Sequence, residues 1–136
     1  MAFSPDGKHI ASGDGENTVR IWDAEDADEL MTLNGHSEAI SAVQFSPDGK
    51  RLVSGSWDDS LKVWDTDRGQ LLLTLTGHKR DVTSVAYSPD GKLIASASED
   101  GMLCLWNAQS GKKLNSSRQH EHSVTAVAFS PDGKRI

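Results

Sequence analysis

The sequence predicts an all-β fold in which one short unit of strands is repeated along the chain. Between its turn residues the chain shows short apolar–polar alternation, and no segment has the period of an amphipathic helix. Two markers recur at the same interval of 42 residues. The first is a tryptophan, at Trp22, Trp64 and Trp106. The second is an aromatic residue followed by Ser-Pro-Asp-Gly-Lys, and its copies begin at Phe3, Phe45, Tyr87 and Phe129.

Residues 51–65 show the strand pattern most clearly. Segments 51–55 (RLVSG) and 60–65 (SLKVWD) have the residue types of strands, and the polar segment 56–59 (SWDD) between them has those of a tight turn. Residues 8–23 and 92–107 have related sequences. The chain is therefore expected to contain three hairpins of the same kind.

Each Ser-Pro-Asp-Gly copy has the chemistry of a tight turn, because proline fixes φ, aspartate tolerates the second central position and glycine accepts positive φ. A short apolar strand precedes three of the copies, at 40–45, 82–87 and 124–129. The first copy lacks this strand, and Met1 aligns with a position inside it. The chain is therefore expected to begin within a repeat.

A further strand should follow each tryptophan after a polar connection. These connections are residues 24–28, 66–70 and 108–112, and the strands are expected at 29–33, 71–75 and 113–117. The unit is thus four strands long. We expect one domain with a partial repeat at 1–35, complete repeats at 36–77 and 78–119, and the start of a further repeat at 120–136.

Composition narrows the range of partners. The 136 residues suffice for one ordinary domain core, and the net charge of −6, with no stripe of basic residues, argues against a nucleic-acid partner. No apolar run is long enough to cross a membrane, and the N-terminus does not resemble a secretory signal. A single cysteine, Cys104, fits a reducing compartment. We expect no cofactor, and a location in the cytoplasm, with the nucleus also open.

The repeat resembles the WD-repeat family. The resemblance covers essentially the whole chain, because a period near 40–45 residues with Gly-His and Trp-Asp markers is typical of that family. Trp106-Asn107 and Gln119-His120 depart from the pattern but keep the Trp or the His. The markers that carry the resemblance are the four turns described above with Gly35-His36, Gly77-His78, Trp22-Asp23 and Trp64-Asp65. It implies a partial β-propeller of four-stranded antiparallel blades, with two complete repeats and two partial ones.

The family resemblance also implies structural tetrads, in which His, Ser, Asp and Trp are joined by hydrogen bonds. Burying a histidine and an indole between sheets requires such partners, since an unpaired buried polar group costs about 1–3 kcal/mol. The first copy offers Ser12 and Trp22, but Glu16 stands at the aspartate position. By position, the two complete tetrads are His36, Ser54, Asp58 and Trp64, and His78, Ser96, Asp100 and Trp106.

Other chemistry in the same residues has a structural interpretation. His78, Ser96 and Asp100 have the residue types of a hydrolase triad, but no nucleophile-elbow pattern accompanies them, and an active site is rarely built several times in one domain. His120 and His122 lack further metal ligands at useful spacing. The sequence therefore favours a protein that is not an enzyme and holds no metal.

Trp57 stands out, because its equivalents are Gly15 and Glu99 and the fold does not require an aromatic there. Its turn is expected to share one face with the Gly-His turns. Tryptophan is enriched at interface hot spots, although a turn tryptophan can also pack on its own neighbours. The residues expected to bind a partner are Trp57, Glu38, Asp59, Lys79, Arg80, Asp81 and Glu99.

The resemblance implies a non-catalytic platform for protein–protein interaction, formed by a fragment of a larger propeller. Its two open sides could also promote self-association. Two alternatives remain. One is a recognition or sensor segment of a large protein that also carries a nucleotide-binding switch domain, and the other, least favoured, is a hydrolase that uses one Ser/His/Asp set.

Overall fold

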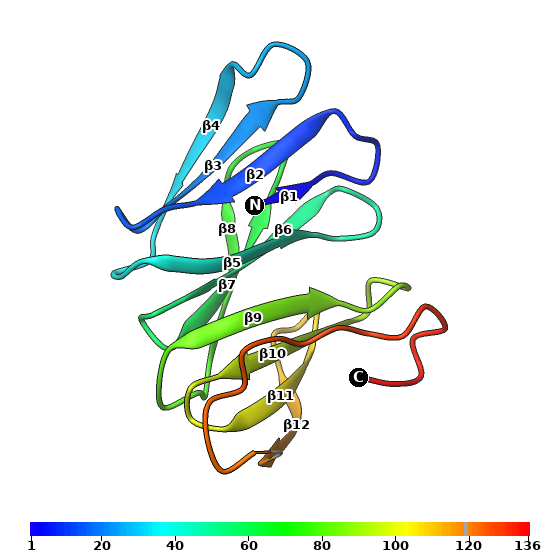
Figure 1. Ribbon diagram of the computed structural model, residues 1–136. Helices are drawn as coiled ribbons and strands as arrows, with labels where there is room; N and C mark the ends of the chain where they lie inside the picture. Colours follow the sequence, from blue (N-terminus) through cyan, green and yellow to red (C-terminus); the bar gives the residue numbers. More distant parts are fainter. Residues whose placement is uncertain (119) are drawn as a thin grey trace.

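Three four-stranded antiparallel sheets form the protein, side by side along the chain. The structure is a computed structural model that describes residues 1–118 and 120–136. The described residues contain strands and turns and no helix. The sheets are arranged as successive blades that do not close into a ring (Figure 1). The all-β fold class and the open propeller architecture are therefore confirmed.

The strands follow the repeat. Blade 1 contains β1 (Ala2–Phe3), β2 (His9–Gly13), β3 (Thr18–Asp23) and β4 (Glu29–Asn34). Blade 2 contains β5 (Ile40–Phe45), β6 (Arg51–Ser56), β7 (Ser60–Asp65) and β8 (Leu71–Thr76). Blade 3 contains β9 (Val82–Tyr87), β10 (Leu93–Ser98), β11 (Met102–Asn107) and β12 (Lys113–Arg118). Each strand pairs with its neighbour in sequence, as expected for a meander joined by short turns.

Alternation of side chains places the repeated tryptophan between blades. In blade 2, Leu52 pairs with Trp64 across β6 and β7, and both side chains are buried. The inner strands β6 and β7 are buried on both faces, whereas β8 is mostly exposed. Packing of successive blades therefore covers the central strands and leaves the outermost strand in solvent.

Two apolar clusters hold the blades together, one at each boundary. The first joins β2, β3 and β4 to Phe45, Leu52 and Trp64 of blade 2. The second joins blade 2 to blade 3 around Val82, Tyr87 and Trp106. A glycine permits the close approach of blades 2 and 3, because a Cβ at Gly55 would lie 2.7 Å from Val82 Cγ1. Stacking blades thus buries what a single blade could not bury alone.

Two expectations for the partial repeats were wrong. The first copy does have an innermost strand, since β1 pairs Ala2 with Ala11 and Phe3 with Ile10. Residues 124–129 do not form a strand. They run beside β9, where Val127 N donates to Ser84 Oγ at 3.2 Å. In blades 1 to 3 each innermost strand pairs with the second strand of its own repeat, and residues 124–129 have no such partner strand among the described residues.

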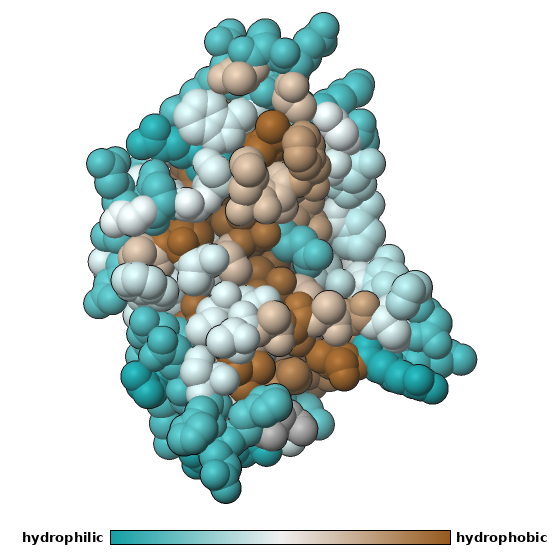
Figure 2. Space-filling view, in the orientation of Figure 1, coloured by the Kyte–Doolittle hydropathy of each residue, from teal (hydrophilic) through white to brown (hydrophobic). Residues whose placement is uncertain are grey.

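The two faces of the blades differ in their turns. The Ser-Pro-Asp-Gly turns lie at the right in Figure 1, and the turns that follow β2, β6 and β10 lie at the left. Apolar residues gather along the middle of the molecule in Figure 2, over the innermost strands, and polar residues cover both turn faces. Gln119 lies outside the described residues. The sequence places it at the glycine position of a Gly-His pair, so the repeat boundary expected there also lies outside them.

Candidate functional site

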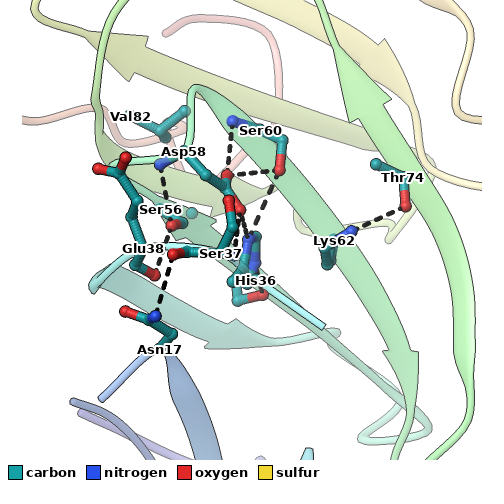
Figure 3. Close-up of polar contacts among 12 residues, drawn as sticks. Asn17, His36, Ser37, Glu38, Ser56, Asp58, Ser60, Lys62, Thr74 and Val82 are labelled. Atoms are coloured by element: carbon teal, nitrogen blue, oxygen red, sulfur yellow. Dashed lines mark hydrogen bonds and ion pairs between the residues drawn. The ribbon is translucent and has the colours of Figure 1, made fainter. Parts of the chain in front are cut away.

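Blade 2 contains a continuous chain of hydrogen bonds from its core to its turn face. Trp64 Nε1 donates to Ser54 Oγ at 2.9 Å, and Ser54 Oγ lies 2.8 Å from His36 Nε2. His36 Nδ1 lies 2.7 Å from Asp58 Oδ2 (Figure 3). The serine and the tryptophan come from the paired strands β6 and β7, the aspartate from the turn between them, and the histidine from the loop before β5. The structure thus brings together four residues spread over 29 positions, from 36 to 64.

The protonation states in this network follow from burial. Burial lowers the pKa of His36, against the raising effect of its hydrogen bond to Asp58, so the ring is neutral at pH 7. Burial raises the pKa of Asp58, but hydrogen bonds from Ser60, His36 and Ser37 outweigh it, and the pKa is lowered. A neutral ring beside a carboxylate carries its proton on Nδ1. His36 Nε2 therefore accepts a hydrogen bond from the Ser54 hydroxyl, and Ser54 Oγ accepts one from Trp64 Nε1. The ring nitrogens of His36 and Trp64 and the Ser54 hydroxyl thus all have partners within this network.

Blade 3 repeats the network with nearly the same distances. Trp106 Nε1 donates to Ser96 Oγ at 2.8 Å, Ser96 Oγ lies 2.7 Å from His78 Nε2, and His78 Nδ1 lies 3.1 Å from Asp100 Oδ2. Burial again lowers the pKa of His78. The ring of His78 meets the indole of Trp106 edge-on, with centroids 6.2 Å apart. Both networks are thus packed as well as hydrogen-bonded.

The aspartates also fix the loops of the turn face, which sequence reasoning missed. Asp58 Oδ2 accepts from Ser37 N at 3.1 Å, and Asp100 Oδ2 accepts from Lys79 N at 2.9 Å. Ser60, also missed, donates from Oγ to Asp58 Oδ1 at 2.6 Å. The role of Ser60 could have been predicted, because a hydroxyl residue two positions after a turn aspartate can donate to it. The contacts of Ser37 N and Lys79 N could not, because any residue other than proline supplies a backbone N–H.

In blade 1 a different residue accepts the hydrogen bonds of the equivalent turn. Trp22 Nε1 donates to Ser12 Oγ at 2.8 Å, but Glu16, at the aspartate position, is exposed. Asp14 takes over: its Oδ1 accepts from Glu16 N at 2.9 Å and from Thr18 N at 3.1 Å, and its Oδ2 accepts from Thr18 Oγ1. The hydrogen bond from Thr18 is the main cause that lowers the pKa of Asp14. Residue types alone do not favour Asp14 over Glu16.

The geometry bears on catalysis as well. Ser96 has no exposed surface, and its hydroxyl is already engaged by His78 and Trp106. A substrate carbonyl has no path to that oxygen. Among the residues that the structure describes, no group of three or more His, Cys, Asp or Glu is arranged to hold a metal ion, and no helix could span a membrane.

The turn face carries the residues expected to bind a partner. Trp57 is 52 % exposed, and its backbone N donates to Ala39 O at 3.0 Å, which fixes the turn. Asp59 lies close to other carboxylates: burial raises its pKa first, and Asp81, Asp58 and Asp100 raise it further. Negative charge is therefore concentrated around Asp59, two residues after Trp57.

Basic groups adjoin the same surface. Arg80 Nη2 donates to Glu99 Oε2 at 2.9 Å, and the side chains of Lys79 and Glu38 are exposed. Glu38 is anchored through its backbone, since its carbonyl accepts from Ser56 Oγ at 2.9 Å. The face thus presents one large aromatic side chain among charges of both signs.

Repeated antiparallel four-stranded sheets that share their cores, each with tryptophan in its third strand, define a protein built from β-propeller blades. Comparison with protein families agrees. The model described as "WD domain, G-beta repeat" matches residues 1–23, 27–65, 69–107 and 111–136. The chain belongs to the WD-repeat family, whose members generally mediate protein–protein interactions.

Several curated proteins contain a similar repeat. Over 43 residues the chain is 44 % identical to the human "U3 small nucleolar RNA-interacting protein 2". This match covers 32 % of the chain and 9 % of that protein. Over 40 residues it is 45 % identical to the yeast "General transcriptional corepressor TUP1", covering 29 % and 6 %. Over 42 residues it is 43 % identical to the "Probable serine/threonine-protein kinase PkwA" of Thermomonospora curvata, covering 31 % and 6 %. Each match spans less than a tenth of the relative's length.

Proposed function

We propose that this chain is a non-catalytic protein-interaction segment whose partner docks on the turn face around Trp57. The exposure of Trp57 is the observation that carries the proposal. Glycine and glutamate occupy the equivalent positions Gly15 and Glu99, so the turn itself has no need of an indole. An exposed tryptophan that the fold does not use has the properties of an interface hot spot.

The surroundings of Trp57 support docking of a polar, charged partner surface. Asp59 and Asp81 supply negative charge on one side, and Lys79 and Arg80 supply positive charge nearby. Charged residues at the rim of an interface contribute mainly to orientation and specificity, while a central aromatic contributes most of the affinity. Glu38 and Glu99 complete the rim.

The buried networks have a role in this function, because they hold the loops of the face in place. Asp58 and Asp100 each bind a loop backbone through Ser37 N and Lys79 N. A surface held in one geometry loses less conformational entropy when a partner binds. In this proposal the tetrads are structural and act on binding only through the loops.

The same proposal extends to the setting of the protein. Burial of Ser96 supports a non-catalytic role, and the net charge of −6 supports protein rather than nucleic acid as partner. A location inside the cell, in the cytoplasm or the nucleus, is consistent with one buried free cysteine, Cys104. Phe3 in blade 1 and Leu114 in blade 3 are exposed apolar residues. They support self-association, in which a second copy of the protein would cover the open sides of these two blades.

Substitution of Trp57 tests the proposal. Trp57→Ala should weaken binding of a protein partner by about 2 kcal/mol or more, while the urea midpoint of unfolding changes far less. Leu72→Ala is the matched control, because Leu72 is an exposed apolar residue on the outer strand β8, 41 % accessible. A protein partner is first isolated by its binding to the unmodified protein. Its affinity for the unmodified protein and for each variant is then measured by titration calorimetry. A destabilised Trp57→Ala chain with unchanged affinity would show that Trp57 is a packing residue.

A further inference from the structure

A pocket of about 590 Å³ lies between blades 2 and 3, on the face opposite Trp57. Two Ser-Pro-Asp-Gly turns form its walls, and the residues that matter for its chemistry are Asp48, Arg51, Tyr87, Asp90, Lys92 and Gln109. It is separate from the proposed docking face and from both tetrads. Its polar groups have no role in the function proposed above.

The hydroxyl of Tyr87 has no use in the fold. The Tyr87 side chain is 6 % exposed, and its oxygen is buried without a hydrogen-bond partner among the residues that the structure describes. Burial raises the pKa of Tyr87 far above its ordinary value, so the hydroxyl remains a donor. The three equivalent positions are phenylalanine, at Phe3, Phe45 and Phe129. Packing therefore accepts a ring without the oxygen, and a buried unpaired hydroxyl is costly unless it is used.

Arg51 and Asp48 line the same pocket as Tyr87, and both act electrostatically on its hydroxyl: Arg51 lowers the pKa of Tyr87 and Asp48 raises it, while burial has the largest effect. Arg51 Nη1 donates to Ala108 O across the blade boundary at 3.0 Å, which fixes the guanidinium. Within the described part of the chain Arg51 has no carboxylate within ion-pair distance, so further N–H donors are free. A fixed cation and a buried hydroxyl thus lie at one site.

The two carboxylates of the pocket are already engaged. Asp48 Oδ1 accepts from Ser46 Oγ at 2.6 Å and from Lys50 N at 3.1 Å. Asp90 Oδ1 accepts from Ser88 Oγ at 2.6 Å and from Lys92 N at 3.0 Å. These bonds lower the pKa of each aspartate, so both stay ionised at neutral pH. With Arg51 and Lys92 they bring the formal charge of the pocket to zero.

The equivalent pocket between blades 1 and 2, of about 500 Å³, lacks this chemistry. There Phe45 stands for Tyr87, His9 for Arg51 and Asp67 for Gln109. The pocket between blades 2 and 3 has therefore gained a hydroxyl donor and a permanent cation and has lost a carboxylate. All three differences favour an anionic ligand.

We propose that the pocket between blades 2 and 3 binds the carboxylate of a glutamate or aspartate side chain on an extended segment of a partner protein. The Arg51 guanidinium donates to one of its oxygens, and the unpaired Tyr87 hydroxyl, which is covered in the unbound protein, donates to the other once the side chains over it move aside. A carboxylate fits better than a phosphate, because Asp48 and Asp90 would repel a second negative charge. A planar guanidinium also matches the geometry of a carboxylate.

The test uses the blocked peptide Ac-Gly-Gly-Glu-Gly-Gly-NH2, its Gln analogue, free glutarate and inorganic phosphate, each titrated into 15N-labelled protein and followed by NMR. The Glu peptide should bind at least about tenfold more tightly than the Gln peptide, and Tyr87→Phe and Arg51→Gln should each weaken it about tenfold. Tyr87→Phe should fold normally, as phenylalanine does at the equivalent positions. Lys50→Gln, at the matching turn position of the neighbouring pocket, is the control and should leave the affinity unchanged.

Four affinity results would each overturn the proposal. They are equal affinity for the Glu and Gln peptides, no loss of affinity in a folded Tyr87→Phe protein, tighter binding of phosphate than of the Glu peptide, and tighter binding of glutarate than of the Glu peptide. The last would assign the pocket to a free small acid in place of a protein segment. Absence of amide shifts at the two pocket turns on saturation with the Glu peptide would overturn it equally.

Discussion

Blades 1 and 2 have the same strand order and hairpin register, but they satisfy their buried polar groups in different ways. In blade 2 the indole of Trp64 is linked through Ser54 and His36 to Asp58. In blade 1 the indole of Trp22 reaches only Ser12. Trp64 is 1 % exposed, whereas Trp22 is half-buried. The two tryptophans thus differ in burial as well as in hydrogen bonding.

The difference shows that the turn and the network are separable. Asp58 serves both, since one oxygen binds His36 and the other binds Ser60. In blade 1 the turn bonds are kept by Asp14 from a position two residues earlier, and Glu16 at the aspartate position is exposed. The hairpin therefore needs a carboxylate near the turn, at either of two positions, whereas the contact with His36 in blade 2 uses the carboxylate at position 58. Variants in both blades can test this distinction.

Removing the histidine of a complete network should have the largest effect. His78→Ala removes one hydrogen-bond partner each from the buried Ser96 hydroxyl and the Asp100 carboxylate and opens a void, so the free energy of unfolding should fall by roughly 2–4 kcal/mol. His122→Ala should have little effect, because His122 is exposed and its equivalents are Glu38 and Arg80. Urea unfolding of both variants measures the contrast. Equal midpoints would contradict a structural role for His78.

Removing the serine should have a smaller effect, and a different one in each blade. Ser54→Ala leaves both the Trp64 N–H and His36 Nε2 unpaired in the core, at a cost of about 1–3 kcal/mol. Ser12→Ala leaves only the Trp22 N–H unpaired, and that side chain is half-buried, so water can replace the hydroxyl. The loss should be below about 1 kcal/mol. A Ser12→Ala loss as large as that of Ser54→Ala would mean that network length does not matter.

The smallest contrast lies within the turn of blade 1. Asp14→Ala removes the acceptor of two backbone N–H groups and of the Thr18 hydroxyl, and should cost about 1 kcal/mol. Glu16→Ala should change stability by less than about 0.5 kcal/mol, since the side chain is exposed and its ion pair with Arg20 spans 3.6 Å. Thermal unfolding of the two variants compares them directly. A larger loss of stability for Glu16→Ala than for Asp14→Ala would show that Glu16, at the position equivalent to Asp58, stabilises the turn instead.

Local chemistry explains how much of the fold could be predicted. The 42-residue period, the alternation in 60–65 and the Pro-Asp-Gly turns predicted β5, β7 and β9 with the observed bounds. The residues of the two networks came from the resemblance to the WD-repeat family, carried over by repeat position. Strands that end in solvent, such as β8, extend one residue further than predicted. Their ends depend on ladder hydrogen bonds with β7, and not on residue type alone.

The sequence by itself determined the blades, because turn stereochemistry and a two-residue side-chain period act between residues that are close in the chain. Tertiary structure decided the rest. It selected Asp14 over Glu16, paired β1 with β2, and brought Arg51 and Tyr87 into the lining of one pocket. Each outcome depends on which donors and acceptors meet across a turn or a blade boundary. That choice is made by distances in space, and residues 36 positions apart, such as Arg51 and Tyr87, carry no mark of it in sequence.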